Sequence, residues 1–446
     1  MKQRLPAILV FLYLLSCIVL GGSAQNPWPN LGLQLVGIAV IAWAAVAANR
    51  HSSNSALYAL ILGALAVVLL QLVPLPASVW TRLPGRDAIE QGLHLLGYET
   101  RAFSISEMPG RSVLTLFAAI PAIAAFIVVD RLAISPGYVA AAIVGGMIAA
   151  IFVGAIQVAG GPNSSAYFYE IHSLGAIGFF ANGNHMGTLL LVGMPMAAAL
   201  VASAKSARGF SGLARIAVGA AVFVVIAVGI ALNGSRAALG LSVPVLIASA
   251  AIFPAAVRWR AAALGASAIA LVVGVAAIAT VSMSASEVSP SPASPAYRQQ
   301  VWATTTRAVA ANFPWGTGLG TFERVYDRYE NPDDITPSYV NHAHNEYLEI
   351  ALELGALGIA LMVLFMGWWA LAGWKIWTSA YGTPFGRAAT IAAAAILAHS
   401  AVDFPLRTGA ISAVFAACLA LMAIDLRHSA GAAVVQSGRK RHVKLG

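Results

Sequence analysis

Long apolar segments follow one another along most of this chain, and they restrict its fold more than any other feature. A helix needs about 20 mainly apolar residues to cross a bilayer, and about 12 segments reach that length. They lie near residues 5–24, 31–49, 56–74, 112–130, 137–159, 184–203, 213–232, 237–254, 261–281, 347–374, 386–402 and 409–426. The pattern predicts an all-α, polytopic integral membrane protein in which residues 1–426 form the transmembrane domain.

Composition excludes an ordinary soluble protein. Hydrophobic residues make up 59% of the chain and charged residues 10%, whereas soluble domains carry about 25% charged residues. Cys17 and Cys418 both lie in apolar segments, so neither a disulfide framework nor a thiolate metal site is expected. Lys2 and Arg4 precede the first apolar segment as in a signal peptide, but no small-residue cleavage site follows, and we interpret this segment as a retained helix.

Charged residues divide unevenly between the two sides of the predicted spans. Lys and Arg are enriched in cytoplasmic loops, and most of the 26 basic residues fall on the side of the two termini. Of the 17 acidic residues, only Asp130 and Asp425 fall there. We expect both termini to be cytoplasmic, with residues 427–446 as a basic tail beside anionic lipid. The net charge of +9 is explained without a nucleic-acid partner.

The longer connections lie on the outer side, at residues 75–111, 160–183 and 283–345. Within the first, Asp87–Leu96 predicts a short interfacial helix. The largest loop begins with a Ser/Pro-rich linker and continues with the spacing of an amphipathic helix from Arg298 to Ala311. The turn-rich stretch Asn312–Gly320 must end that helix.

The sequence His342-Ala343-His344-Asn345-Glu346 stands where the largest outer loop meets the tenth apolar segment. Asn345 is a preferred N-cap residue, so a helix is expected to begin just after it, with His344 at the membrane surface. The pKa of an ordinary histidine lies near neutral pH, which suits His344 to general-base catalysis. A single histidine here would more often only solvate a helix end, but His342, Asn345 and the acidic residues that follow favour a functional site.

Three carboxylates, Glu346, Glu349 and Glu353, follow at helical spacing and share one face. Carboxylates within a span are costly and usually face a polar cavity or a partner. They are expected to orient a histidine, to pair with an arginine or to bind a sugar hydroxyl, and structural ion pairing is an equal alternative. We take Glu346 as a candidate catalytic residue and Glu353 as a candidate substrate-binding residue.

Two arginines on the outer side are candidate phosphate ligands. Arg236 lies in a very short connection between the seventh and eighth spans, and Arg298 lies early in the largest loop. A guanidinium binds phosphate oxygens with two hydrogen bonds and stays charged, although an arginine can also simply reach the headgroups. Together they could neutralise the diphosphate of a lipid-linked sugar without a metal.

Lesser candidates are Asn182, Asn184 and His185 at the start of the sixth span. Beyond the eleventh span, Asp403 and Arg407 are expected to pair with each other in a structural role.

Metal-binding patterns are weak. Asp333-Asp334 lies between prolines, as in a solvated loop, and His342-x-His344 has no third ligand at a suitable spacing. No metal or other cofactor is expected.

Several motifs together resemble the O-antigen ligase / O-antigen polymerase family of bacterial membrane glycosyltransferases. The similarity covers about residues 180–410 and rests on Asn182-Gly183-Asn184-His185, Ser235-Arg236, Arg298 with Trp302, Pro314–Gly320, His344-Asn345-Glu346-Tyr347-Leu348 and Glu353–Gly358.

This resemblance implies a twelve-helix fold similar to C-type glycosyltransferases, in the bacterial inner membrane, with the active site in the periplasm. Such enzymes move a glycan from an undecaprenyl-diphosphate carrier to an acceptor, inverting the anomeric carbon without a metal. By position, His344 resembles the general base, and Arg236 and Arg298 the diphosphate ligands. Asn184, His342 and Asn345 are further candidate substrate-binding residues.

The motifs leave the acceptor open. Transfer to the lipid A core (a ligase) is our first interpretation, and joining of carrier-linked repeats (a polymerase) is the second. Transfer to a protein hydroxyl is the third, because the chain shows no added C-terminal domain. A transporter is the alternative from another class; it would place charges near the bilayer midplane and have similar halves, whereas here the polar residues gather in outer loops.

Overall fold

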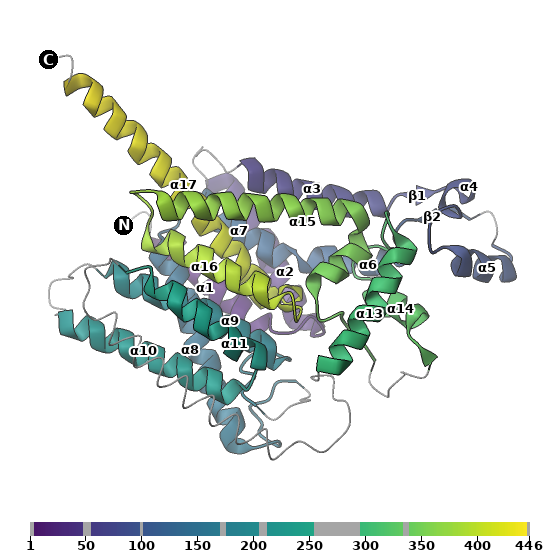
Figure 1. Ribbon diagram of the computed structural model, residues 1–446, viewed down its shortest axis with the longest axis horizontal. Helices are drawn as coiled ribbons and strands as arrows, with labels where there is room; N and C mark the ends of the chain where they lie inside the picture. Colours follow the sequence, from purple (N-terminus) through teal and green to yellow (C-terminus); the bar gives the residue numbers. More distant parts are fainter. Residues whose placement is uncertain are drawn as a thin grey trace.

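The computed structural model describes residues 4–47, 55–98, 101–169, 175–204, 212–253, 295–332 and 339–443, and this part of the chain is largely helical (Figure 1). The helices are α1 (Arg4–Leu20), α2 (Pro27–Ala47), α3 (Ser55–Gln71), α4 (Ala77–Trp80), α5 (Asp87–Leu95), α6 (Pro109–Ala118), α7 (Ile120–Arg131), α8 (Pro136–Gly160), α9 (Gly183–Ser203), α10 (Gly212–Asn233), α11 (Arg236–Ala250), α13 (Pro295–Asn312), α14 (Phe322–Tyr329), α15 (Glu346–Thr378), α16 (Pro384–His399) and α17 (Gly409–Val443). A 3₁₀ turn, η2 (Pro405–Arg407), precedes α17, and two short strands, β1 (Pro74–Leu75) and β2 (Phe103–Ser104), pair antiparallel.

Each predicted span within the described residues coincides with a helix, or with the consecutive helices α6 and α7 for segment 112–130. The predicted span 261–281 lies outside the described residues. Seven of the described segments are long and apolar enough to cross a membrane, whereas α1, α3 and α11 are shorter apolar helices. The chain is therefore a multi-pass, all-α membrane protein, and the full count of about 12 spans stays a prediction.

Helix α9 forms the centre of the bundle. Every residue from His185 to Ala199 is buried, and α8, α10, α11 and α16 pack around it. Peripheral helices instead expose large apolar side chains, such as Leu62 on α3, Val228 on α10 and Val363 on α15. Apolar side chains that point outward are stable next to lipid, so these surfaces are expected to face the hydrocarbon.

The predicted outer connections meet at one end of the bundle. The Ala181 amide donates to the Gly22 carbonyl (3.2 Å), and the Ala410 amide donates to the Gly21 carbonyl (3.0 Å). At the opposite end, Arg427 Nη1 lies 2.6 Å from Asp130 Oδ1. This arrangement agrees with spans that alternate in direction, while the assignment of the first end to the periplasm stays a prediction.

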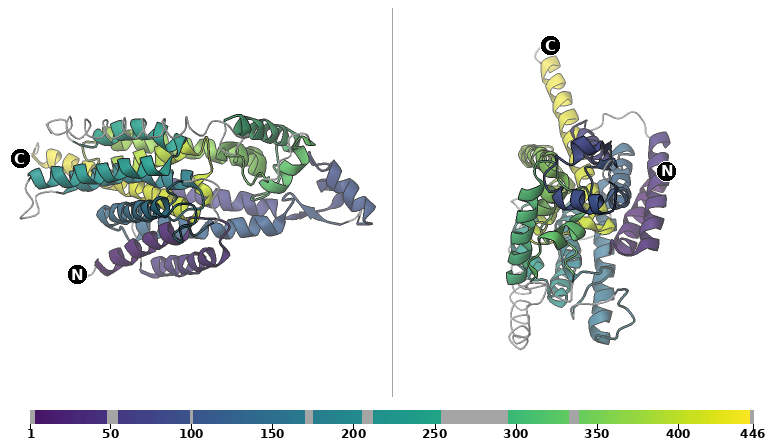
Figure 2. Two further views of the ribbon diagram at one scale, coloured as in Figure 1. Left: turned by 90° about the horizontal axis from the view of Figure 1, so that it is seen from below. Right: turned by 90° about the vertical axis from the view of Figure 1, so that its right-hand side faces the viewer.

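The loop between α3 and α6 packs on the segment that follows α13. The Ser106 amide donates to the Gln71 carbonyl (2.8 Å), and the Glu107 amide donates to the Thr317 carbonyl (2.8 Å). Arg328 of α14 also pairs with Glu107. The predicted helices at Asp87–Leu96 and Arg298–Ala311 are confirmed as α5 and α13, and Figure 2 shows α4 and α5 projecting beyond the bundle.

The C-terminal segment that we expect to be a basic tail is helical in its described residues. Helix α17 continues from Gly409 to Val443 without a break, and its apolar part reaches Ala432. Residues 427–443 thus extend the last helix away from the bundle (Figure 1).

Candidate active site

Asn345 caps α15 as predicted. Its side-chain oxygen accepts hydrogen bonds from the amides of Tyr347 and Leu348, both at 3.1 Å. This satisfies two amides of the first helical turn that have no partner within the helix. His344, just before the cap, has a left-handed backbone (φ 49°), a conformation that histidine adopts more readily than most residues. The Ala343 carbonyl is held by Trp302 Nε1 at 2.9 Å, so the backbone on both sides of His344 is fixed.

Asp403 is the residue around which the site is assembled. Its side chain is fully buried; Oδ1 lies 3.5 Å from His344 Nδ1, and Oδ2 lies 3.8 Å from Arg298 Nη2. The side-chain amide of Asn184 (Nδ2) also donates to Oδ2. One carboxylate therefore joins α9, α13 and the start of α15, and it brings together three residues that were predicted separately.

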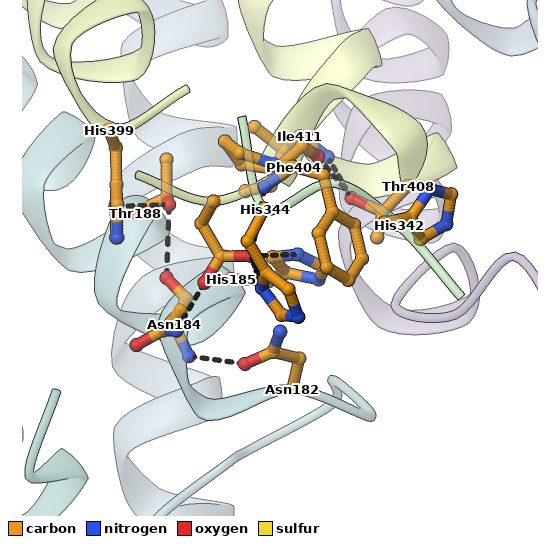
Figure 3. A network of polar contacts seen from close by, with 12 residues as sticks. Asn182, Asn184, His185, Thr188, His342, His344, His399, Phe404, Thr408 and Ile411 are labelled. Atoms are coloured by element: carbon orange, nitrogen blue, oxygen red, sulfur yellow. Dashed lines mark hydrogen bonds and ion pairs between the residues drawn. The ribbon is translucent and has the colours of Figure 1, made fainter. Parts of the chain in front are cut away.

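Further polar residues extend this group into the bundle. Ser235 Oγ donates to Asn184 Oδ1 (2.6 Å), and Thr188 Oγ1 lies 2.8 Å from His399 Nδ1. His185 Nε2 lies 3.9 Å from Asp403 Oδ1. Figure 3 shows the network between the start of α9 and the segment around Phe404.

Asp403 stays ionised despite its burial. Burial raises the pKa of its carboxyl, but His344, with His185 and His399 nearby, outweighs burial, so the pKa lies well below its usual range. An ionised Asp403 can hold His344 in one orientation and stabilise a positive charge on its imidazole, as the aspartate of a catalytic triad does.

A second group lies around Glu349 on α15. His342 Nδ1 is 2.8 Å from Glu349 Oε1, and the Ala343 amide donates to Oε2 (3.1 Å). Arg407 Nη2 lies 3.3 Å from Glu349 Oε1 and 3.0 Å from Glu353 Oε2. Although burial lowers the pKa of Arg407, Glu349, Glu353 and Glu346 raise it above its usual value, so its guanidinium stays charged.

The predicted pair between Asp403 and Arg407 is wrong. Asp403 contacts Arg298, His344 and Asn184, while Arg407 contacts Glu349 and Glu353. The Asp403 amide donates to the His399 carbonyl (3.0 Å) at the end of α16, whereas Arg407 lies in η2. The two side chains therefore belong to different parts of the site. An aspartate in an otherwise apolar stretch at the outer end of a span was the sequence signal for its importance.

Glu346 is only 4% exposed. Its carboxylate accepts hydrogen bonds from the Leu406 amide (2.7 Å) and Ser400 Oγ (3.2 Å), and its amide donates to the Ser400 carbonyl (2.9 Å). These contacts hold the segment between α16 and α17, which carries Asp403. The geometry fits a positioning role for Glu346 better than contact with substrate.

Glu353 accepts hydrogen bonds through Oε1 from the amides of Gly320 (2.9 Å) and Phe322 (3.4 Å). It is fully buried and joins α15 to the turn that follows α13.

Arg236 stands at the first position of α11, and its side chain is exposed. Within the described residues it makes no ion pair. The preceding residue, Ser235, bonds to Asn184, so the start of α11 is tied to the Asp403 group, and the guanidinium is free to bind an anion there.

The Phe404 ring packs against the three imidazoles of the site. The centroid of the Phe404 ring lies 4.1 Å from the ring centroid of His342 and 5.0 Å from those of His344 and His185. His342 and His344 are partly exposed, at 22% and 14%, as is Arg298 at 18%. These side chains can meet a substrate, whereas the carboxylates behind them are buried.

Metal ligation has no support within the described ranges, where no group of three or more His, Cys, Asp or Glu residues is placed to hold an ion. The absence of a metal from the reaction stays a prediction.

Helices with apolar outer surfaces define a multi-pass membrane protein, and the polar group around Asp403 lies at one end of its bundle. Residues 221–363 match the family model of O-antigen ligase, and this match supports the resemblance that the motifs predicted. No curated protein matches the chain. The matched residues include Arg236, Arg298, His342 and His344, whereas Asn184 and Asp403 lie outside them. The family is that of ligase- or polymerase-type glycosyltransferases, whose substrates are glycans and lipid-linked molecules at a membrane.

Proposed function

We propose that this protein transfers a glycan from an undecaprenyl-diphosphate carrier to an acceptor hydroxyl at the periplasmic face of the bacterial inner membrane, and that the acceptor is the lipid A core. The observation that supports this most is the convergence of His344, Arg298 and Asn184 on the buried carboxylate of Asp403. A positioned base next to a phosphate-binding arginine is the arrangement that transfer from a diphosphate needs.

His344 acts as the general base. With Nδ1 toward Asp403, its Nε2 is free to take the proton of the acceptor hydroxyl as the oxygen attacks the anomeric carbon. The bond between that carbon and the diphosphate oxygen breaks, and undecaprenyl diphosphate leaves with the electron pair. Asp403 then stabilises the imidazolium of His344 until the proton is lost to water.

Arg298 and Arg236 bind the diphosphate and offset its charge as it leaves. Arg298 reaches the site from α13, and Arg236 from the start of α11. Two guanidiniums supply this charge from the protein itself, which is why we propose a reaction that needs no metal.

The test is the surface glycan profile of a strain that lacks the gene, complemented with the wild type, with His344→Ala, or with His94→Ala as a matched control on the exposed helix α5. We expect the deletion and His344→Ala strains to keep full-length glycan on the carrier and to lack it on the lipid A core. The wild type and His94→Ala should restore transfer.

Other profiles point to other functions. Cores that carry a single repeat, without longer chains, would show a polymerase. Normal transfer by a well-produced His344→Ala protein would contradict the role of His344. An unchanged profile in every strain would contradict the proposed function and favour the transporter.

A further inference from the structure

His342 is fixed in one orientation by groups that lie behind it. An ionised carboxylate can only accept hydrogen bonds, so in the 2.8 Å contact the Nδ1–H of His342 donates to Glu349 Oε1. Glu349 itself is held by the Ala343 amide and by Arg407. Among the described residues, the remaining nitrogen of His342, Nε2, has no such partner, and 22% of the side chain is exposed.

The groups behind His342 offer a diphosphate no unpaired cation. The guanidinium behind His342, on Arg407, is already paired with Glu349 and Glu353. A dianionic group beside His342 would lose water without gaining an unpaired guanidinium from these residues, and such a loss is costly. A neutral sugar hydroxyl meets no such penalty.

The position of His342 leads to the same assignment. Arg298 lies against Asp403, whereas His342 is held by Glu349 and packs, like His344, against the ring of Phe404. Figure 3 places His342 and Asn184 on opposite sides of that ring. In an inverting displacement, the acceptor approaches the face of the sugar opposite to the leaving group. The diphosphate side contains Arg298, which leaves the His342 side for the acceptor.

We propose that His342, oriented by Glu349 and Arg407, is the acceptor-binding residue: its Nε2 hydrogen bonds to a hydroxyl of the acceptor sugar, next to the hydroxyl that His344 deprotonates. The ring centroids of both histidines lie within 5.0 Å of the Phe404 centroid, close enough for one monosaccharide to contact both. This inference rests on the proposed function and adds to it separate roles for the two histidines.

The experiment uses the full-length protein in lipid vesicles. The donor is the carrier-linked glycan that accumulates in the deletion strain, and the acceptor is the lipid A core from the same strain. Initial rates are measured while each substrate is varied in turn, for wild type, His342→Gln, Glu349→Gln, His344→Gln and the exposed control His94→Gln.

Loss of one hydrogen bond to the acceptor weakens the binding of the substrate and of the transition state equally. We expect His342→Gln and Glu349→Gln to raise the KM for the acceptor about five- to tenfold, with little change in kcat or in the KM for the donor. His344→Gln should instead lower kcat by about 100-fold or more. A residue that only supports the fold would not separate the two KM values in this way.

Three results would overturn the inference. A rise in the KM for the donor would place the diphosphate beside His342, and a large fall in kcat with an unchanged acceptor KM would make His342 the base. Wild-type kinetics of His342→Gln would show that His342 does not bind the acceptor. Absence of transfer by the wild type would instead contradict the proposed function itself.

Discussion

At the scale of single residues, the buried carboxylate of Asp403 decides how the site is arranged. It contacts residues from three separate segments, His344, Arg298 and Asn184. A buried charge is retained only where its partners offset the cost of its desolvation. Each of these side chains therefore depends on Asp403 for its position, and Asp403 depends on them for its charge.

Replacing Asp403 with asparagine should test this dependence. Asparagine keeps the shape but removes the charge that orients His344 and stabilises its imidazolium, so we expect kcat to fall by about 100-fold or more. Asp87→Asn on the exposed face of α5 is the matched control. A rate for Asp403→Asn within about threefold of the wild type would exclude an electrostatic role.

The same variant has a second readout in the pH dependence of stability. Because the pKa of Asp403 lies below its usual range, the ionised form stabilises the folded state. That contribution is complete above the ordinary aspartate pKa of about 4 and is lost as pH falls toward the lowered pKa. The difference in melting temperature between wild type and Asp403→Asn should be constant from neutral pH to about pH 5 and should narrow in more acidic buffer.

At the scale of elements, α15 combines a membrane helix with part of the site because it bends at Gly355. The backbone there has φ 59° and ψ −147°, a conformation almost restricted to glycine. The bend frees the carbonyls of Leu352 and Glu353, which accept hydrogen bonds from the amides of Thr317 (3.0 Å) and Gly318 (2.9 Å). The turn after α13 is thereby fixed to α15, and with it the helix that carries Arg298.

Gly355→Ala should break this connection. A Cβ at Gly355 would lie 2.1 Å from the Pro314 carbonyl oxygen, and the positive φ adds a cost of about 1–3 kcal/mol. We expect a lower melting temperature in detergent and loss of transfer. Gly367→Ala is the control in the same helix, since a Cβ there meets nothing within 4 Å, and it should be neutral or slightly stabilising. Equal stability of both variants would show that the bend is not required.

At the scale of the whole molecule, the two ends of the bundle differ in chemistry. One end holds Asp403, the buried glutamates of α15 and the four histidines of the site, His185, His342, His344 and His399. The other holds the ion pair between Arg427 and Asp130 (2.6 Å), and Asp425 there accepts a hydrogen bond from the Thr383 amide (2.9 Å). The excess of Lys and Arg near this second end predicts that it faces the cytoplasm.

Cysteine labelling can establish this orientation. The native residues Cys17 and Cys418 are buried, so they should give little background with a membrane-impermeant maleimide. We expect Gln91→Cys, on α5, to react in spheroplasts, and Ala380→Cys, between α15 and α16, to react only after lysis. The reverse pattern would place the site in the cytoplasm and would contradict a periplasmic reaction.

The positions of the helices and the start of α15 followed from the sequence because both depend on local interactions. A span satisfies its backbone groups within itself and must be apolar along its length, and Asn345 caps the helix that begins one residue later. The same local pattern put Glu346, Glu349 and Glu353 on one face of α15. Helix α5 and helix α13 could be predicted for similar reasons.

The tertiary structure alone decided which charges meet. Asp403 and Arg407 are close in the chain and were predicted to pair, yet the turn at Pro405 places them in separate groups. Asp403 instead meets Asn184 and Arg298, and Arg407 meets Glu349 and Glu353 of α15. Such contacts depend on how distant helices pack, and no local pattern of residue types records that packing.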